Sequence, residues 1–383
     1  MSLKKILITV LSLTMALGLL AGCSTSTVTP ATSTKTSGTP TQGTTEKLKV
    51  GILYISPKTD GGWSEAHARG FKEALTNIGE DKVEYIELEN ILDTDAAKTE
   101  AAVRQLAESG CKIIFATSYG YMDIIERLSK EYTNIKFEHC SGTKSNTTNF
   151  DNYFGQIEQP RYLTGIMAGL ATKTNKIGYV AAQPFPEVIR GLNAFTLGVR
   201  SVNPTAQVYV EWTMSWFDLD KEKENAIALL NKGCDVMAQH QDSSAALVAA
   251  EEKGVFGIGY DNPMGKFAPK GYLSAPIFNW GAYYEKKITA MLDNTWKVET
   301  TWGGMKENMV AIDTMSTNVS ADAKAKVELA KTKMLEKGND AIFVGPIKDN
   351  TGNEVVATGK TLTKSEQYSM IWLVDGVVGK LPS

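Results

Sequence analysis

Residues 47–70 read KLKVGILYISPKTDGGWSEAHARG and decide the fold of this chain. The run at 48–55 is apolar and rich in β-branched residues, as in a strand buried in the middle of a parallel sheet. A glycine loop follows at 59–62, and Ser64 is placed to cap a helix over 65–78. A helix that begins at the carboxyl edge of a sheet offers free N–H groups, so we expect a ligand site here. Trp63 in that loop either covers the core or faces the ligand.

Composition places the chain among globular proteins. Its 383 residues are 43% hydrophobic and 22% charged, which is enough to build a sizeable core and favours two domains over one. The net charge is -3, and no basic stripe with interleaved aromatic residues is present. Nucleic acid is therefore not an expected partner.

The N-terminus has the pattern of a lipoprotein signal. Lys4 and Lys5 precede an apolar run at 6–20, and Leu-Ala-Gly-Cys at 20–23 resembles a bacterial lipobox. We predict a signal peptide over 1–22 and a lipid on Cys23. A transmembrane helix is the alternative, but the run is short for that role. Residues 23–46 are rich in Ser and Thr and form a tether, so the protein is expected on the extracytoplasmic face of the cell membrane.

The remaining cysteines and the histidines do not indicate a metal site. Cys111, Cys140 and Cys234 are an odd set without a C-x-x-C spacing, and we expect buried free thiols. One disulfide among them is the alternative outside the cell. The histidines are scattered along the chain, so no metal and no cofactor is expected.

Strand-like and helical runs alternate after the first unit and predict an α/β fold. A polar stretch at 141–152 divides them into two series, so we expect two doubly wound parallel-sheet lobes with a cleft between their strand ends. Residues 47–156 form the N-terminal lobe and 157–280 the C-terminal lobe in this interpretation, and 281–383 return to complete both. The expected strands are 83–88, 111–117, 135–140, 176–181, 207–212, 234–238 and 255–260, and the expected helices are 95–108, 122–131, 158–172, 187–202, 219–231 and 243–253.

Aromatic and polar side chains recur where the predicted strands end. Aromatic rings can sandwich a planar ligand, and stacking contributes about 1–3 kcal/mol per base. Carboxylates and amides can then bind the donors and acceptors on the ligand edge. Each aromatic residue alone could equally belong to the core; their recurrence favours a site. The candidate ligand-binding residues are Asp60, Trp63, Ser64, Tyr119, Arg190, Trp212, Phe217, Gln241, Asp242, Asp261 and Trp280.

Sequence patterns of an enzyme are missing. We find no dinucleotide fingerprint, no G-x-S-x-G and no phosphate-binding P-loop, and no carboxylate spacing that requires catalysis. Asp60, Asp242 and Asp261 could form paired acids in a cleft, but ligand binding is the simpler use of them. The sequence thus favours a binding protein that is not an enzyme.

Several of these motifs resemble the basic membrane protein (BMP) family of ABC-transporter substrate-binding lipoproteins, which includes purine nucleoside receptors. The resemblance spans nearly the whole chain beyond the tether and implies a type I periplasmic-binding-protein fold with a hinge. The motifs that carry it are VGILYISPKTDGGWSEAHARG, YFGQIEQPRYLTGIMAG, GCDVMAQHQDS, GIGYDN and IFVGPIKDNTGNEVVATGKTL, followed by MIWLVDGVVGKLP.

The resemblance also bears on the ligand. Nucleoside receptors of the family look to have Asp-x-Ser-Phe-Asn in the first loop, where this chain has Trp63 in place of Phe and Ser64 in place of Asn. They also look to carry a ribose-binding lysine where residues 273–280 read LSAPIFNW, without a lysine. Asp261 matches the acidic position at a strand end. This pattern implies a purine base in preference to a nucleoside.

Our interpretation is therefore a lipid-anchored, monomeric receptor that captures a purine nucleobase or nucleoside and delivers it to an ABC permease. A receptor that signals to a membrane partner is one alternative, and an extracellular nucleoside hydrolase is another. Genes for a permease and an ATPase beside this one would separate transport from signalling. A hydrolase would convert the nucleoside, and a binding protein would return it unchanged.

Overall fold

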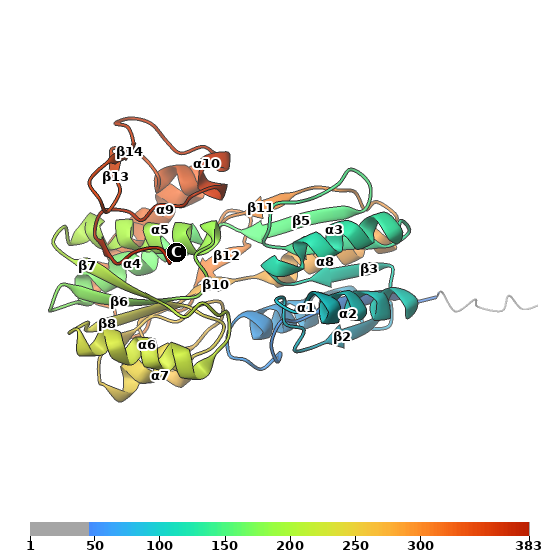
Figure 1. Cartoon of the computed structure of the whole chain (residues 1–383), viewed down its shortest axis with the longest axis horizontal. Coiled ribbons are helices and arrows are strands. Elements are labelled where there is room, and N and C mark those ends of the chain that lie inside the picture. Colours follow the sequence, from blue (N-terminus) through green and yellow to red (C-terminus); the bar gives the residue numbers. More distant parts are fainter. Residues whose placement is uncertain (1–45, 383) are drawn as a thin grey trace, which may run out of the picture. The chain divides into compact units, whose positions relative to one another are not determined.

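A computed structural model describes residues 46–382, which fold around two parallel sheets. The predicted signal peptide, the lipidation site Cys23 and nearly all of the tether lie outside the described residues. We call the two sheets with their helices the first lobe and the second lobe (Figure 1). Both sheets are parallel and covered on both faces, as the sequence predicted.

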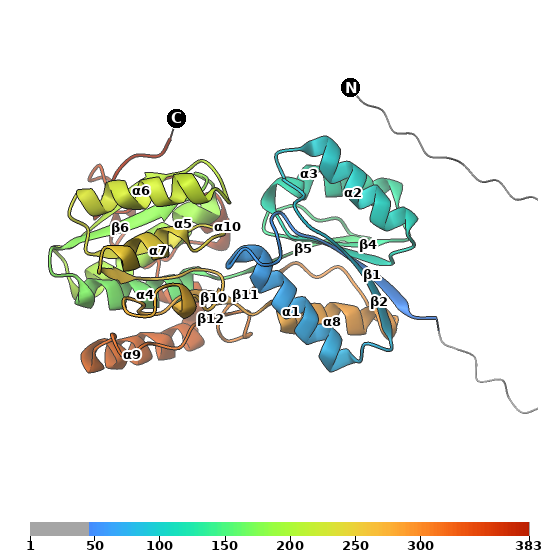
Figure 2. The same ribbon diagram turned by 90° about the horizontal axis from the view of Figure 1, so that it is seen from below.

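The first lobe has a six-stranded sheet in the order β11-β5-β4-β3-β1-β2. Helices α1 and α8 pack on one face, and α2 and α3 pack on the other (Figure 2). Its strands are β1 (Leu48–Leu53), β2 (Val83–Leu88), β3 (Ile113–Ala116), β4 (Lys136–Cys140), β5 (Phe150–Gly155) and β11 (Thr301–Gly303), and its helices are α1 (Trp63–Ile78), α2 (Ala96–Glu108), α3 (Met122–Glu131) and α8 (Trp280–Leu292), with a short 3-10 turn at Tyr119–Tyr121.

The second lobe has a five-stranded sheet in the order β15-β7-β6-β8-β9. Helices α4 and α5 pack together on one side, and α6 and α7 on the other. Its strands are β6 (Lys176–Ala181), β7 (Gln207–Trp212), β8 (Val236–His240), β9 (Phe256–Gly257) and β15 (Val377–Val378), and its helices are α4 (Glu158–Ala171), α5 (Pro186–Val202), α6 (Leu219–Asn231), α7 (Ala245–Glu252) and α9 (Ala321–Lys337), with 3-10 turns at Gly265–Phe267 and Gly338–Ala341.

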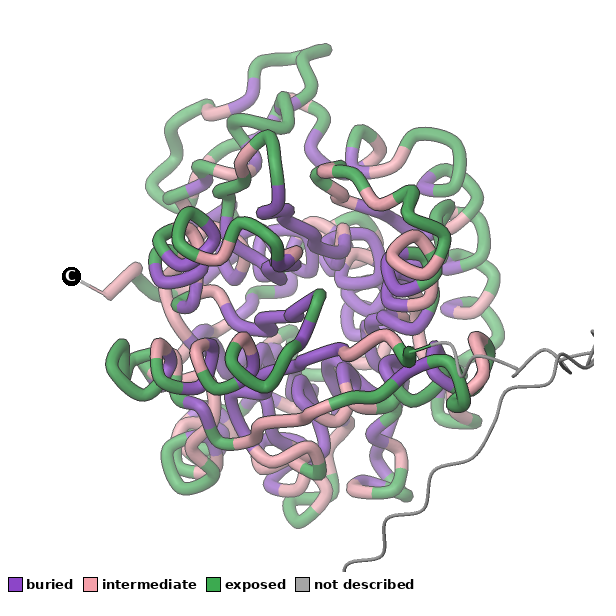
Figure 3. The backbone as a smooth tube through the Cα atoms, turned by 90° about the vertical axis from the view of Figure 1, so that its right-hand side faces the viewer, coloured by how far each residue is buried: buried purple, intermediate pink, exposed green. Residues whose placement is uncertain are grey.

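Glycine allows the close approach of α4 and α5. A Cβ atom on Gly165 would lie 2.1 Å from the Phe195 carbonyl oxygen, and one on Gly198 would lie 2.1 Å from the Tyr162 oxygen. Neither position has room for a side chain, so these helices pack backbone to backbone. Burial follows the same plan, with the strands and the inner helix faces buried and the loops exposed (Figure 3).

The chain passes between the lobes from β5 to α4, from β10 (Pro276–Phe278) to α8, and from β11 to β12 (Val310–Ile312). Strands β10 and β12 form an antiparallel pair at these crossings. The C-terminal segment then adds β13 (Ile347–Lys348), β14 (Glu354–Val356) and α10 (Lys364–Tyr368) before β15 pairs with β7 and becomes the edge strand of the second sheet. Residues after 280 therefore belong to both lobes.

Two sequence predictions about local structure were wrong. Ser64 does not cap the first helix: α1 begins at Trp63 after Gly62, and the Asp60 carboxylate accepts the N–H groups of Gly62, Ser64 and Glu65 at 2.9–3.0 Å. A carboxylate has about four acceptor sites and a hydroxyl two, so Asp60 can accept all three N–H groups. The stretch 141–152 is not wholly a connection, because β5 begins at Phe150. Asp151 and Asn152 in this strand are polar although they are buried, so the segment lacks the apolar pattern that predicts a strand.

Buried charge explains those polar residues. Lys287 on α8 is 3% exposed, and its Nζ lies 2.5 Å from Asp151 and 3.3 Å from Glu138 on the adjacent strands. Glu138 also accepts the Tyr283 hydroxyl at 2.6 Å and the Trp296 indole N–H at 2.7 Å. The returning helix α8 is therefore attached to the sheet by an ion pair that is hydrogen-bonded on several sides, as a buried charge requires.

Candidate functional site

A cavity of about 20 Å³ lies where the carboxyl ends of the two sheets meet. Each lobe supplies half of its wall, and its volume is far below the range of about 300–1,000 Å³ that is usual for ligand pockets, so the lobes must move apart before a ligand can enter. We call it the first cavity. Its wall consists of Trp63, Ser118, Tyr119, Ser141 and Phe154 from the first lobe, and Glu187, Trp216, His240, Asp242 and Tyr260 from the second.

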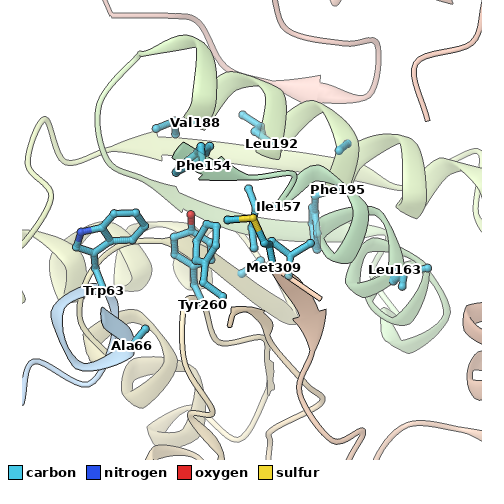
Figure 4. Packing of buried hydrophobic residues seen from close by; sticks show 14 of the residues in the cluster. Trp63, Ala66, Phe154, Ile157, Leu163, Val188, Leu192, Phe195, Tyr260 and Met309 are labelled. Atoms are coloured by element: carbon cyan, nitrogen blue, oxygen red, sulfur yellow. The ribbon is translucent and has the colours of Figure 1, made fainter. Parts of the chain in front are cut away.

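Trp63 is held in one orientation beside this cavity. Its indole N–H donates to the Thr117 carbonyl oxygen at 2.6 Å, and its ring meets Phe278 edge to face at 5.5 Å. Trp63, Phe154 and Tyr260 come from separate elements and lie close to one another (Figure 4). A ring that is already ordered loses little conformational entropy when a ligand stacks on it.

Aromatic rings of the two lobes also meet beside the first cavity. Tyr119 of the first lobe stacks on Phe185 of the second, with ring centres 4.7 Å apart and an interplanar angle of 21°. Phe185 lies 5.9 Å from Trp216, and Tyr260 lies 4.4 Å from His240. The walls can therefore contact a flat ligand on more than one side.

Two buried aspartates provide the strongest acceptors near the first cavity. Asp242 is 4% exposed and lines the first cavity. Asp261 follows Tyr260 in the sequence and is fully buried. Within residues 46–382, neither carboxylate oxygen of Asp261 has a hydrogen-bond partner. Burial raises the pKa of both groups, and the charge of Asp261 raises that of Asp242 further. Buried acceptors without donors favour a ligand that brings N–H or O–H groups.

The backbone at Asp261 supports a functional role. Its φ is +65°, a conformation that non-glycine residues adopt rarely and that costs free energy. The Arg161 guanidinium lies 3.7 Å from the centre of the Tyr260 ring, and its charge opposes the rise that burial causes in the pKa of Asp261. The acids nevertheless outnumber this cation, so the surroundings favour a ligand that donates hydrogen bonds.

Glu187 and Ser141 join the lobes at the edge of the first cavity. The Ser141 hydroxyl donates to Glu187 Oε2 at 2.5 Å. Burial raises the pKa of Glu187 to about 7, and the Ser141 hydrogen bond and Arg190 oppose this rise. This contact closes one side of the cavity by a polar bond between the lobes.

Comparison with known proteins identifies the family. A family model described as "ABC transporter substrate-binding protein PnrA-like" matches residues 47–342. The chain belongs to the Bmp family. Members of this family are substrate-binding proteins of ABC transporters, which work outside the cytoplasm with a small-molecule ligand and a membrane permease. The resemblance found in the sequence is therefore confirmed.

Curated relatives of this Bmp protein include two long matches. A purine-binding protein of Brucella abortus is 39% identical over 337 residues, which cover 88% of this chain and 95% of the relative. A protein of Haloferax volcanii, provisionally named an ABC transporter glucose-binding protein, is 34% identical over 362 residues, with 94% and 88% covered. The two names point to different ligands.

Solved structures confirm the fold. A solute-binding protein of an ABC transporter system from Aeropyrum pernix matches with a TM-score of 0.67 at 16% identity, covering 80% of this chain and 94% of the other. Another from Conexibacter woesei matches with a TM-score of 0.61 at 20% identity, covering 76% and 96%. The Bmp protein thus has the two-lobed periplasmic-binding-protein fold that was predicted.

The structure brings only some of the predicted site residues of the Bmp protein to the first cavity. Trp63, Tyr119 and Asp242 line it. Gln241 lies buried beside Asp242, where its amide donates to Thr213 Oγ1 at 2.9 Å and its Oε1 has no partner within residues 46–382. Asp60 and Ser64 are occupied at the start of α1, and Ser64 Oγ is 2.6 Å from Ser56 Oγ.

Four other predicted residues do not line the first cavity. Trp280 is fully buried, stacked on His67 at 4.6 Å and on Phe278 at 4.5 Å, so it belongs to the core of the first lobe. Trp212 donates its indole N–H to the Lys380 carbonyl at 3.0 Å, and Phe217 is half-buried in the loop before α6. Arg190 pairs with the buried Glu158 and faces a neighbouring cavity.

Sequence reasoning did not select several wall residues of the Bmp protein. The strand-end rule does point to Trp216, His240 and Tyr260, which lie at or after the ends of β7, β8 and β9, although they were not chosen as candidates. Phe154 was missed because β5 was not recognised. Ser141 and Glu187 carry no local signal, because their significance depends on their contact with each other.

Within residues 46–382 the Bmp protein has no cluster of His, Cys, Asp and Glu that could hold a metal ion. Cys111, Cys140 and Cys234 are free and buried in this part of the chain, and burial raises the thiol pKa of Cys111 and Cys234 to about 11. No helix among the described residues is long and apolar enough to cross a bilayer.

Proposed function

We propose that this protein captures a purine nucleobase in the first cavity and delivers it to an ABC permease. The observation that carries the proposal is the wall of that cavity, where aromatic rings from both lobes and the Asp242 carboxylate surround a small space, with the unpartnered buried carboxylate of Asp261 next to Tyr260 of the wall in the sequence. A planar ring with N–H groups on its edge satisfies both features at once.

The aromatic walls would provide most of the affinity. Stacking of a base on an aromatic side chain is worth about 1–3 kcal/mol. Trp63 is fixed by its bond to Thr117, and Tyr119 is backed by Phe185, so both rings are ordered before the ligand arrives. Closure of the lobes around the base would bury it and present the closed form to the permease.

The carboxylates would provide specificity. Asp242 at the wall and Asp261 behind it can accept N–H donors such as the ring and exocyclic N–H groups of a purine. A ligand without such donors would leave buried acceptors unpaired, which costs about 1–3 kcal/mol for each group. We therefore place both aspartates among the ligand-binding residues.

Two features favour a base over a nucleoside. The first cavity is small, and residues 273–280 carry no lysine where ribose-binding relatives look to have one. The Brucella relative, named as a purine-binding protein, supports the purine class. The proposal includes the lipid on Cys23, which would keep the protein at the outer face of the membrane as a monomer, and it includes no catalytic step.

A sugar is the second candidate, because aromatic faces and carboxylates can also bind a hexose and the Haloferax relative carries a glucose-binding name. The test is mass spectrometry of the small molecule released when purified protein is denatured, followed by calorimetric titration of ligand-free protein. The titrants are adenine, guanine, hypoxanthine, xanthine, their nucleosides and glucose.

We expect a purine base to be released, to bind on titration and to be recovered unchanged. Binding of glucose and of no purine would overturn the proposal, and conversion of a nucleoside would establish the hydrolase alternative. Trp212→Ala is the matched control, because this tryptophan lies outside the first cavity and its loss should leave ligand affinity unchanged.

A further inference from the structure

Arg161 is a fully buried cation that packs against the wall of the first cavity. It lies on α4, and its Nη1 donates to the Gln239 carbonyl oxygen at 2.5 Å. Its Cζ lies 3.7 Å from the centre of the Tyr260 ring, which lines the cavity. Its Nε and Nη2 have no hydrogen-bond partner within residues 46–382. Donors that are buried without a partner cost free energy, so Arg161 is poorly explained by the stability of the fold alone.

A glycine leaves a small space between Arg161 and His240. A Cβ atom on Gly191 would lie 3.6 Å from Arg161 Nε and 3.7 Å from His240 Nδ1, so both nitrogens border the same point. Like Arg161 Nε, His240 Nδ1 has no partner in the described part of the chain. An arginine nitrogen can only donate a hydrogen bond. His240 Nδ1 therefore faces a donor, and a hydrogen on Nδ1 would be repelled by it.

His240 is neutral and so carries a single N–H group. Burial, followed by the charges of Arg161 and Arg190, lowers the pKa of this histidine well below its usual range. A neutral imidazole holds its hydrogen on one ring nitrogen, and the neighbours of the ring decide which one. Because Nδ1 faces the Arg161 donor, the favoured tautomer of His240 holds the hydrogen on Nε2.

This tautomer determines how the Tyr260 hydroxyl is oriented. His240 Nε2 lies 3.1 Å from the Tyr260 hydroxyl oxygen. With its hydrogen on Nε2, His240 donates to that oxygen, and the hydroxyl must point its own hydrogen away from the imidazole. Tyr260 lines the first cavity, and its hydroxyl opposes the rise that burial causes in the pKa of Asp261. The hydroxyl hydrogen is therefore available to acceptors on the ligand side.

We propose that Arg161 is a positioning residue of the ligand site: through His240, it orients the Tyr260 hydroxyl as a hydrogen-bond donor to the ligand. This inference rests on the proposed function. Asp242 in the same wall accepts hydrogen bonds, so the wall offers one donor and one acceptor. The ligand that fits both presents an acceptor atom beside an N–H group, as adenine does with N7 and its amino group.

NMR of protein with ¹⁵N-labelled histidine tests the tautomer without any ligand. The chain has three histidines, and His240→Gln identifies the signals of the ring in question. We expect His240 of the wild type to be neutral and to carry its hydrogen on Nε2 at neutral pH. Arg161→Met should move that hydrogen to Nδ1 or divide it between the two nitrogens. Arg161→Lys keeps a cationic donor and should retain the tautomer of the wild type.

The matched control for these spectra is Arg200→Met. Arg200 pairs with Asp375 at 3.3 Å on the surface of the same lobe, so its loss should leave His240 unchanged. Melting temperatures show which variants are folded. The wild-type spectrum tests the inference even where Arg161→Met does not fold.

Calorimetric titration with adenine, guanine, hypoxanthine and xanthine tests the effect on the ligand. Tyr260→Phe removes the hydroxyl and keeps the ring on which Arg161 packs. We expect Tyr260→Phe and Arg161→Met each to weaken purine binding about 3- to 10-fold, as for the loss of one hydrogen bond. The double variant should bind within about 2-fold of Tyr260→Phe, because the hydroxyl through which Arg161 acts is already absent. If Arg161 only supported the ring, its loss would weaken Tyr260→Phe as much as it weakens the wild type.

Three results would overturn the inference alone: a wild-type His240 that is charged or carries its hydrogen on Nδ1, a tautomer that a folded Arg161→Met leaves unchanged, or additive losses of affinity in the double variant. Failure of the wild type to bind any of the four bases would instead overturn the proposed function, and the role of Arg161 toward the ligand with it. The His240 spectrum requires no ligand, so the two failures are distinguishable.

Discussion

The hydroxyl of Ser141 donates to Glu187 Oε2 at 2.5 Å, and this bond joins the first lobe to the second. Lys266 and Glu65, 3.3 Å apart, and Arg69 with Asn262, 3.0 Å apart, join the lobes elsewhere. The Ser141–Glu187 bond differs from these because Ser141 is buried, Glu187 is half-buried, and both line the first cavity. It should therefore respond to pH as well as to the ligand.

Glu187→Gln should make stability less dependent on pH. The pKa of Glu187 is raised to about 7, above that of an unfolded glutamate near 4.3, so its stabilising protonated form is complete below about pH 4 and is lost as the pH rises through 7. The wild type should thus lose a few kcal/mol of unfolding free energy between pH 5 and pH 8 that the variant keeps. Urea unfolding at both pH values measures this.

Burial also raises the pKa values of Glu138 and Glu222 to about 7. Glu187→Gln should therefore still lose some unfolding free energy between pH 5 and pH 8, but less than the wild type. Glu126→Gln is the control. Lys144 lowers the pKa of the half-buried Glu126 carboxylate, so its loss should not flatten the dependence of stability on pH between pH 5 and pH 8. Parallel curves for wild type and Glu187→Gln would contradict the assignment.

Trp63→Ala should weaken purine binding about 10- to 100-fold, because about 1–3 kcal/mol of stacking is lost. With only 8% of Trp63 exposed, we expect the melting temperature to fall as well. Trp63→Phe keeps an aromatic ring but loses the hydrogen bond to Thr117, so it should retain more purine affinity and a higher melting temperature than Trp63→Ala. Equal affinities for all three proteins would remove Trp63 from the site.

Free bases should bind more tightly than their nucleosides. No lysine lies within residues 273–280, and Phe278 in this segment is fully buried against Trp280, so a ribose would have no charged partner there. Competition between adenine and adenosine, and between guanine and guanosine, in one buffer measures the preference. Tighter binding of both nucleosides would contradict it.

Lys287→Met should destabilise the first lobe by about 3–5 kcal/mol, because Glu138 and Asp151 would remain buried without their cation. Lys286→Met is the matched control. Lys286 precedes Lys287 in the sequence and pairs with Glu299 at the surface, where such a pair is worth less than about 1 kcal/mol. Urea unfolding of the three proteins gives both values. A loss no larger than that of Lys286→Met would show that the buried pair is not needed for stability.

Cys23→Ser should release the protein from the membrane, because Cys23 ends the lipobox pattern and precedes the tether. Fractionation of cells that produce the wild type or the variant tests this, with Cys111→Ser as a control for the loss of a thiol. Retention of Cys23→Ser in the membrane fraction would refute the lipid anchor.

The sequence by itself determined the elements whose pattern is local. Strands β2, β6 and β7 and helix α6 have the bounds that were predicted, because alternation in a strand and 3.6-residue periodicity in a helix are set by neighbours in the chain. The same rule placed Trp63, Tyr119 and Asp242 at strand ends, where the parallel topology brings them together.

Tertiary structure alone decided which of the strand-end residues face the first cavity and which belong elsewhere. Trp280 is an aromatic residue next to a strand end, as expected of a site residue, but the return of α8 to the first lobe buries it against His67. Strand β11 pairs with β5, and Ser141 meets Glu187, only because distant segments pack side by side. Periodicity fixes the face on which a residue lies, whereas the contact that this face makes depends on how the two lobes and their returning segments pack.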